Sequence, residues 1–205
     1  MKLYQSKRAP NPRRVRWFMA EKGIENIEIV EVDIFAGDHR TPAYLSMAGL
    51  PNVPALELDE GTGITESIAI CRYLEHLYPE PNMFGTTPLE TAIIEMWTRR
   101  AEMMVGTPLM LTVRHSHPAL AALEKQVPAI AEAQLATAER GMKVLDHRLG
   151  QSEFIAADRI TMADIVAFVS IDFARMVKFR PAGELTHVAR WMDTMGAQPA
   201  ASEGA

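Results

Sequence analysis

Residues 52–78 have the sequence NVPALELDEGTGITESIAICRYLEHLY, in which a strand pattern changes into a helix pattern. Residues 55–58 alternate apolar and polar side chains, and the glycines that follow can adopt the positive φ of a hairpin turn before a return strand at 64–65. From 66 to 78 the apolar side chains recur at helical spacing instead, and Pro79 ends the pattern. This stretch therefore predicts a β-hairpin followed by a helix.

The residues before this stretch alternate in the same way between short strand patterns and helix patterns. The expected strands are 2–5 and 27–34, and the expected helices are 12–22, which Gly23 stops, and 41–47. The order of elements is β, α, β, α, β, β, α. Residues 1–80 are therefore predicted to form one α/β domain.

Beyond Pro81 the strand pattern disappears and only helical periodicity remains. The segment 80–88, EPNMFGTTP, contains residues that interrupt regular structure and marks a linker. An all-helical C-terminal domain is predicted over residues 88–205, and its small, polar end from Ala197 to Ala205 is expected to be frayed. The expected helices of this domain are 89–113, 129–149, 162–176 and 184–195.

One local motif fixes the start of a helix in the second domain. Thr161 stands at the N-cap position and Asp164 at the third helical position, where the two can form a capping box. The motif predicts structure and carries no chemistry.

The composition excludes several classes of protein. The 205 residues are 48% hydrophobic and 23% charged, with a net charge of -5, so the chain is expected to fold and to have no general attraction to nucleic acid. It has no apolar run long enough for a membrane span and no signal peptide pattern, which predicts a soluble cytoplasmic protein. Because Cys71 is the single cysteine, an internal disulfide, a CxxC pair and a Cys-rich zinc site are excluded. Thiol chemistry would need Cys71 or an external thiol.

Three segments of the first domain would converge on one edge of its sheet. Residues 9–12, APNP, begin a helix whose N-terminus favours negative charge. At 52–55, a cis Pro54 would leave the backbone of Val53 free to pair with an extended peptide. At 65–68, a serine and helical N–H groups can hold a carboxylate. Each segment also has a purely structural interpretation, as a helix entry, a tight loop or an N-cap.

The order of these segments resembles that of the glutathione transferases over nearly the whole chain. The resemblance lies in APNPRRVRWFMAEKGI at 9–24, NVPALELDEGTGITES at 52–67 and DRITMADI at 158–165. It implies a thioredoxin-like N-terminal domain that binds glutathione as co-substrate, an all-helical C-terminal domain, and a homodimer without a metal. A hydrophobic co-substrate site would lie between the two domains.

The resemblance also implies roles for individual residues in glutathione binding. Val53 and Pro54 match the pair that binds the cysteinyl backbone. Glu66 and Ser67 match the pair that holds the γ-glutamyl end, with Glu66 accepting from the ammonium and Ser67 donating to the carboxylate. His39 and Arg40 lie where the family often places a side chain for the glycyl carboxylate, in a variable loop.

The catalytic position departs from the family pattern. Many members have Ser or Cys where Ala9 stands, and others use a Tyr nearer the strand. Asn11 matches an asparagine near the glutathione sulfur, and its amide can donate to a thiolate without acting as a base. Ser6, at the end of the first strand, is a second candidate that is also explained as a turn residue.

The segment APNPRRVR at 9–16 most resembles the sequences of a fungal and bacterial subgroup related to the theta and omega classes. In the fungal representative of that subgroup, a water held by Ser and His of the helical domain assists the thiol. His115 and His117 are the matching candidates here, because imidazole titrates close enough to neutral pH to act as a base. The structural alternative is that both complement the C-terminal dipole of a helix.

A stripe on the same helix would line the co-substrate pocket. It consists of Met103, Met104, Thr107, Leu111 and His115. Methionines suit a pocket that accepts several apolar shapes, although such a stripe is also typical of an ordinary core.

The function predicted from this resemblance is conjugation of the glutathione thiolate to electrophilic apolar small molecules, as in detoxification. The alternatives are glutathione-dependent reduction of peroxides or disulfides, and a non-catalytic binding or scaffold protein. Cys71 lies on the core-spaced face of its helix, so it is predicted to be buried and inert.

Overall fold

The computed structural model describes residues 1–202 of the chain, which form two compact units. The first unit contains residues 1–81 together with the C-terminal segment from Pro199, and the second contains residues 82–198. The chain therefore leaves the first unit once and returns to it at its end. The helical domain expected over 88–205 differs from this division at both ends.

The first unit contains a four-stranded mixed sheet with the order β2-β1-β3-β4. β1 is parallel to β2 and antiparallel to β3, and β3 is antiparallel to β4. The predicted strands are all present, but β2 is shorter than the expected segment 27–34, because its only neighbour in the sheet has four residues. The strands are β1 (Lys2–Gln5), β2 (Glu28–Glu31), β3 (Ala55–Glu57) and β4 (Gly63–Thr65).

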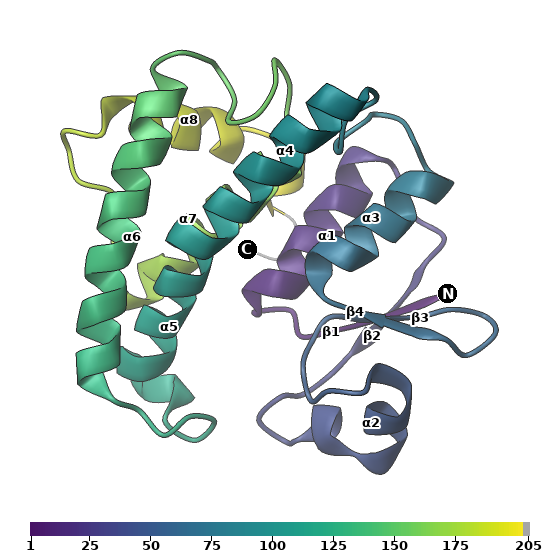
Figure 1. The fold of residues 1–205 in the computed structure, drawn as a ribbon. Coiled ribbons are helices and arrows are strands. Elements are labelled where there is room, and N and C mark those ends of the chain that lie inside the picture. The colour runs from purple at the N-terminus through teal and green to yellow at the C-terminus, as the bar shows by residue number, and fades with distance from the viewer. Residues whose placement is uncertain (203–205) are drawn as a thin grey trace. The chain divides into compact units, whose positions relative to one another are not determined.

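Helices cover both faces of this sheet, as in a thioredoxin-like domain. α1 (Pro10–Glu21) and α3 (Ser67–Leu77) lie on one face, and α2 (Pro42–Ala48) lies on the other (Figure 1). The predicted α/β fold of this part of the chain is therefore confirmed. The apolar side chains between the sheet and helices α1 and α3 are fully buried. They include Leu3, Val15, Phe18, Leu56, Ile70 and Leu74.

α2 approaches the sheet closely and holds the turn that precedes β3. A side chain at Gly63 would place its Cβ 2.1 Å from the carbonyl oxygen of Met47, so this contact requires glycine. Tyr44 is buried in a cluster with Val32, and its hydroxyl donates to the carbonyl oxygen of Asn52. Burial raises the pKa of Tyr44 to about 12, so the phenol stays protonated and keeps this bond at neutral pH.

The C-terminal segment packs against α1 and is not frayed as expected. Residues Pro199–Ser202 form a short 3-10 helix in which Ala200 and Ala201 are buried. The guanidinium of the buried Arg13 donates a 2.8 Å hydrogen bond to the carbonyl oxygen of Ala201. The prediction of a frayed end was wrong here because alanines, which show no periodicity, fit closely against a helix. Residues 203–205 lie outside the described part of the chain.

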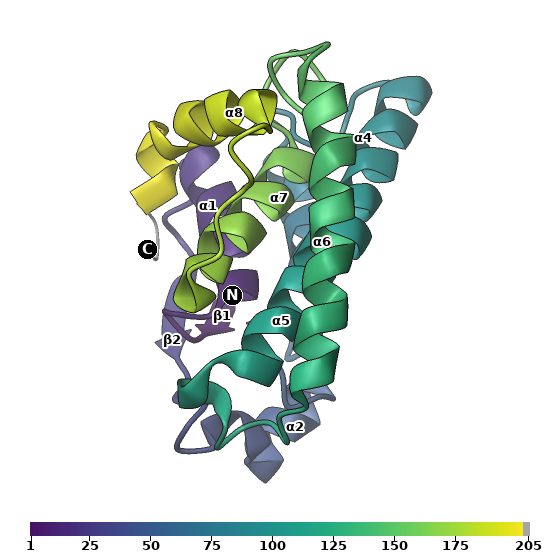
Figure 2. The same ribbon diagram turned by 90° about the vertical axis from the view of Figure 1, so that its left-hand side faces the viewer.

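The second unit is built from helices around a central one. All residues of α7 from 162 to 171 are buried, while α6 is the longest helix and α8 lies across its C-terminal end (Figure 2). The all-helical C-terminal architecture is thereby confirmed. The helices are α4 (Pro88–Ala101), α5 (Thr107–Ser116), α6 (Pro128–Leu149), α7 (Met162–Phe173) and α8 (Thr186–Gly196). Within residues 1–202, no helix combines the length and apolar character that crossing a membrane requires.

The helix expected over 89–113 is interrupted by a π-helical segment at Glu102–Gly106, between α4 and α5. This segment is in close contact with α6, since a Cβ at Gly141 would lie 2.3 Å from the carbonyl oxygen of Met104. A π segment adds a residue to the turn, which shifts the helical phase by about 100°. A single helical face therefore does not extend across both α4 and α5.

The capping box predicted at the start of α7 is present. Asp164 is fully buried, and its Oδ2 accepts from the backbone N–H of Thr161 at 3.0 Å and from the Thr161 hydroxyl at 2.9 Å. Its Oδ1 accepts from the backbone N–H of Ile155 and the indole N–H of Trp191. Burial raises the pKa of this carboxyl, and the four hydrogen bonds oppose that shift. The motif therefore connects α7 to the preceding loop and to α8.

Glu90 in the first turn of α4 predicts an acid dependence of stability. Its carboxylate pairs with Arg159 at 2.7 Å and accepts from the backbone N–H of Thr86, and these bonds lower its pKa to about 2. A lowered pKa means that the group stabilises the fold above its unfolded pKa of about 4.3, and that this contribution is lost as the pH falls toward about 2. We expect the urea midpoint of the wild type to fall more steeply between pH 4.5 and pH 2 than that of Glu90→Gln.

Glu132→Gln, at an exposed glutamate on α6, is the matched control and is expected to follow the wild type. Equal slopes in Glu90→Gln and the wild type would show that the ion pair does not stabilise the folded state.

Candidate functional site

The register of the sheet brings the predicted site segments to one end of the first unit. Ala55, the first residue of β3, pairs with Tyr4 on one side and with Thr65 on the other. The turn that enters β3, the end of β1 and the end of β4 are therefore neighbours. Since β2 is parallel to β1, the loop that follows β2 also leaves from this end.

The turn before β3 presents a free stretch of backbone. The Val53–Pro54 peptide bond is cis, which is the isomer that frees the backbone of Val53. Among the described residues, none forms a hydrogen bond with the N–H or C=O of Val53. Pro54 is buried and the preceding carbonyl of Asn52 is bound by Tyr44, so the turn is held in place on both sides of Val53. These groups can pair with an extended ligand backbone.

The start of α3 combines a strained backbone with a buried hydroxyl. Glu66 is exposed and has φ 68°, a conformation that costs a residue with a side chain about 1–3 kcal/mol. Ser67 follows as the first helical residue and is buried. No described residue accepts from the backbone N–H groups of Ser67 and Ile68. A carboxylate at this position would meet a hydroxyl, two N–H groups and the positive end of a helix dipole.

Arg14 also belongs to this site, although it was not among the residues predicted from the sequence. The guanidinium is buried and its Nη1 lies 3.5 Å from the Ser67 hydroxyl oxygen, to which it donates a long hydrogen bond. Its charge also acts on Cys71, one turn further along α3, where it opposes the larger effect of burial. The available signal was its position on α1, since Arg14 shares the apolar face of Val15 and Phe18 at helical spacing.

The first turn of α1 offers one backbone donor and not several. Pro10 and Pro12 have no N–H, and the N–H of Arg13 donates to Ala9 at 3.4 Å. Only the backbone N–H of Asn11 remains available to a ligand in this turn. The side-chain Oδ1 of Asn11 is buried without a hydrogen-bond partner. Because rotation exchanges the two ends of a carboxamide, Asn11 can offer either an acceptor or a donor to a ligand. The preference of this helix start for negative charge therefore rests on one backbone N–H and on the helix dipole.

Ser6 and Ala9 close the turn between β1 and α1. The N–H of Ala9 donates to the carbonyl of Ser6 at 2.9 Å, and Ala9 serves as the N-cap without a side-chain bond. The structural interpretation of Ser6 as a turn residue is consistent with this bond.

His39 and Arg40 differ sharply in their surroundings. His39 is buried within a 3-10 turn, and its Nδ1 has no hydrogen-bond partner, whereas Arg40 is exposed. Burial, and secondarily the charge of Arg40, lowers the pKa of His39, so the imidazole is neutral at neutral pH. His39 can therefore donate a single hydrogen bond to a carboxylate, while Arg40 can supply charge.

Cys71 is fully buried, as predicted, and burial raises the pKa of its thiol. It is therefore not a nucleophile. Among residues 1–202, no group of three or more His, Cys, Asp and Glu side chains is placed to hold a metal ion.

The two histidines at the end of α5 have local structural partners. The Nδ1 of the buried His115 accepts from the backbone N–H of Val127 at 3.3 Å. The Nδ1 of His117 accepts from the backbone N–H of Ala119 at 3.2 Å and caps the following turn. Each bond uses the lone pair of one ring nitrogen, and the other nitrogen then carries the proton. This geometry favours the structural alternative over general-base catalysis.

The residues of the stripe expected to line the co-substrate pocket differ in their solvent exposure. Met103 and Thr107 are exposed, whereas Leu111 is half-buried and His115 is buried. Met103 and Met104 lie in the π segment, whose extra residue changes the helical phase before α5. The residues therefore rotate from the surface toward the core along the helix.

Comparisons with known proteins match this fold and this sequence to one family. The sequence model of the glutathione S-transferase N-terminal domain matches residues 9–77, and that of the C-terminal domain matches residues 101–199. Glutathione S-transferase 2 of Saccharomyces cerevisiae is 32% identical over 97% of this chain and 87% of its own length.

Comparison with solved structures points to the same family. The crystal structure of Gtt2 from Saccharomyces cerevisiae covers the whole of both chains with a TM-score of 0.93 and 32% identity. A glutathione S-transferase domain-containing protein from Marinobacter aquaeolei gives a TM-score of 0.91 and 35% identity over 98% of this chain and 99% of its own. With a thioredoxin-like unit, a helical unit and a relative of this similarity, the chain belongs to the glutathione S-transferase family.

Proposed function

We propose that this glutathione S-transferase conjugates the glutathione thiolate to electrophilic apolar small molecules. The backbone of Val53, beside Pro54, pairs with the cysteinyl backbone of glutathione. Glu66 accepts from the γ-glutamyl ammonium, and Ser67 with its N–H donates to the γ-glutamyl carboxylate. His39 and Arg40 meet the glycyl carboxylate.

The observation that carries this proposal is the pairing of Ala55 with both Tyr4 and Thr65. It gathers a free backbone, a helix N-terminus with a buried hydroxyl, and a helix start with an unpartnered carboxamide at one end of one sheet. These groups complement a tripeptide that has a peptide backbone, a terminal carboxylate and a thiolate.

The proposed activating group is Asn11. Its amide and its backbone N–H stabilise the thiolate, and solvent takes the proton because neither group is a base. At pH 7 a free thiol of pKa about 8.5 is only about 3% ionised, so each unit by which the pKa falls increases the thiolate nearly tenfold. Ala9 has no group for this purpose, and Ser6 is the second candidate.

The co-substrate region is proposed at Met103, Met104, Thr107 and Leu111, with His115 and His117 at the end of the same helix. The homodimer remains a prediction of the family resemblance, and the cytoplasmic location remains a prediction of the sequence pattern. A second enzymatic candidate is glutathione-dependent reduction of peroxides or disulfides, which also needs no protein thiol and is compatible with the buried Cys71.

Parallel assays test the reaction class. The protein is mixed with glutathione and chlorodinitrobenzene, with a peroxide, or with a mixed disulfide, and turnover is followed. We expect fastest turnover with chlorodinitrobenzene and an increase of the melting temperature with glutathione. Fastest turnover with the peroxide or the disulfide would replace transferase chemistry by reduction, and no thermal shift would remove the proposed glutathione site.

The Asn11→Ala variant tests the activating group. We expect its rate with chlorodinitrobenzene to be about tenfold lower at pH 6.5 and to approach that of the wild type at high pH, because the thiol pKa rises by about one unit. Ser6→Ala is the matched control and is expected to keep the wild-type profile. A shifted profile in Ser6→Ala, with an unchanged one in Asn11→Ala, would assign the role to the serine.

A further inference from the structure

The turn between β1 and α1, residues 6–9, has few bonds of its own. One backbone hydrogen bond closes it, from the N–H of Ala9 to the carbonyl of Ser6, and Ala9 begins α1 without a side-chain cap. Pro10 and Pro12 supply no N–H to the first turn of the helix. The place of this helix start therefore depends on bonds from outside the turn.

Glu31, the last residue of β2, supplies two of these bonds. Its Oε1 accepts from the side-chain Nε2 of Gln5 at 2.6 Å, and its Oε2 accepts from the backbone N–H of Lys7 at 3.2 Å. The register of β1 and β2 places Glu31 opposite Gln5, directly before the turn. One carboxylate therefore connects β2 both to the end of β1 and to the turn.

Arg16, in the second turn of α1, binds the same groups from the other side. Its Nη2 donates to the carbonyl oxygen of Lys7 at 2.9 Å, and its Nη1 donates to the Oε1 of Gln5. Gln5 is buried, and its carboxamide is engaged at both ends, by a carboxylate and by a guanidinium. Because hydrogen bonds to charged groups are stronger than neutral ones, this network ties the turn to β2 and to α1.

The helix start that this network holds carries Asn11. Within residues 1–202, the Asn11 Oδ1 has no hydrogen-bond partner, so no bond at this atom fixes the carboxamide. Its placement then depends on the backbone of the first turn. A donor stabilises a thiolate only at hydrogen-bond distance, and a displacement of about 1 Å can lower a rate by up to about 100-fold.

We propose that Glu31 is a positioning residue for the transferase reaction. Through Lys7 and Gln5 it holds the turn 6–9, so that Asn11 stays within reach of the glutathione sulfur. This inference rests on the function proposed for Asn11.

Glu31→Gln tests the inference in the intact protein. A glutamine has the same shape but accepts at one oxygen only, so one of the two donors loses its acceptor. We expect the rate with chlorodinitrobenzene to be about fivefold lower at pH 6.5 and to approach the wild-type rate at high pH, as in Asn11→Ala. The KM for glutathione is expected to stay within about twofold of the wild type, because the residues proposed to bind its backbone and γ-glutamyl end are unchanged.

Glu28→Gln is the matched control for this variant. It makes the same change of charge at an exposed position at the other end of β2 and is expected to keep the wild-type pH profile. A double-mutant cycle separates positioning from a general effect. In an Asn11→Ala background, Glu31→Gln is expected to change the rate by less than about twofold, because the group that it positions is gone.

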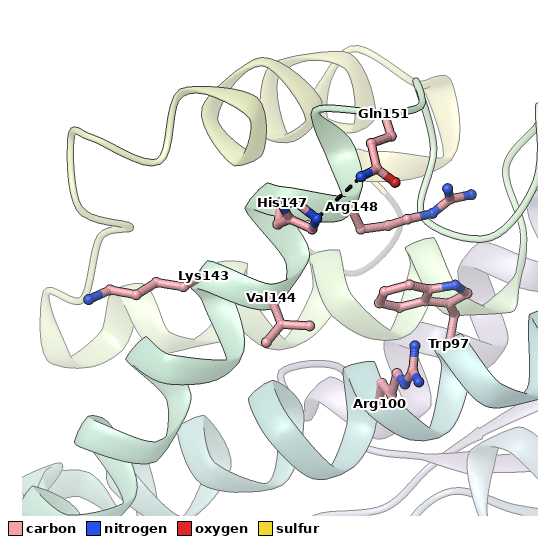
Figure 3. A pocket seen from close by; sticks show the side chains of 7 residues that line it. All are labelled: Trp97, Arg100, Lys143, Val144, His147, Arg148 and Gln151. Atoms are coloured by element: carbon pink, nitrogen blue, oxygen red, sulfur yellow. Dashed lines mark hydrogen bonds between the residues drawn. The ribbon is translucent and has the colours of Figure 1, made fainter.

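Arg16→Met opens the network from its other end and is expected to shift the pH profile in the same direction. Arg148→Met, in the helical unit, is its matched control. Figure 3 shows Arg148 beside Trp97, and its Nε donates a 2.8 Å bond to the carbonyl oxygen of Ile155. This control loses a comparable guanidinium bond, so it is expected to lower the melting temperature and to leave the pH profile unchanged.

The outcomes separate this inference from the function on which it rests. The positioning role is overturned if Asn11→Ala shifts the pH profile and Glu31→Gln does not. It is also overturned if Glu31→Gln behaves like Glu28→Gln, or if its effect is undiminished in the Asn11→Ala background. An unchanged profile in Asn11→Ala would instead remove the proposed activating group, and the positioning role with it.

Discussion

Asp164→Ala is expected to lower the free energy of unfolding by about 4 kcal/mol, because several buried donors lose their acceptor at once and each unsatisfied group costs about 1–3 kcal/mol. The carboxylate accepts four hydrogen bonds in a site with no solvent exposure. The donors come from Thr161, Ile155 and Trp191, which belong to the N-cap, the preceding loop and α8. Urea unfolding followed by circular dichroism measures the loss.

Asp158→Ala is the matched control for this variant. The Asp158 side chain is 96% exposed and close in sequence, so its removal is expected to change the unfolding free energy by less than about 0.5 kcal/mol. Asp164→Asn keeps an oxygen for Ile155 and Trp191 but turns an N–H₂ group toward the Thr161 N–H, which predicts an intermediate loss. A loss below about 1 kcal/mol in Asp164→Ala would mean that solvent replaces the carboxylate, and would contradict a buried role.

The capping box of Thr161 and Asp164 shows why much of the fold could be predicted from the sequence. Its residues are three positions apart, and its geometry depends on the local backbone. The C-terminal end of α3 is local in the same sense, since Pro79 follows two residues after its last residue, Leu77. The π segment is different, because it is in contact with Gly141 on another helix. The periodicity of α4 and α5 contains no information about that contact.

In the candidate site, too, the features that depend on local sequence and strand order could be predicted, and those that depend on packing could not. The position of Val53 beside Glu66 follows from the order of the strands and could be predicted. The direction of a side chain could not, because packing decides it: His115 turns toward the loop before α6, and Arg14 lies against Ser67. The loss of two N–H groups at the start of α1 could have been predicted from the prolines alone.

The functional effect expected to be largest is on glutathione affinity in Ser67→Ala. The proposed hydroxyl bond to the γ-glutamyl carboxylate is charge-assisted and buried, so its loss is expected to raise the KM for glutathione by about 10- to 100-fold, which corresponds to about 1.5–3 kcal/mol. Ser67 is 4% exposed and Arg14 donates to its hydroxyl oxygen, which leaves the hydroxyl proton available for the ligand. Steady-state rates at varied glutathione, with fixed chlorodinitrobenzene, measure the change.

The split between KM and kcat distinguishes binding from chemistry in this variant. Because the carboxylate is remote from the sulfur and is held equally before and during the reaction, kcat at saturating glutathione is expected to remain within about threefold of the wild type. Ser170→Ala removes another buried serine hydroxyl, in α7, and is expected to leave the KM unchanged. An unchanged KM in Ser67→Ala would place the γ-glutamyl group elsewhere, whereas a fall in kcat alone would mean that Arg14 and Ser67 act on the position of α1 and its Asn11.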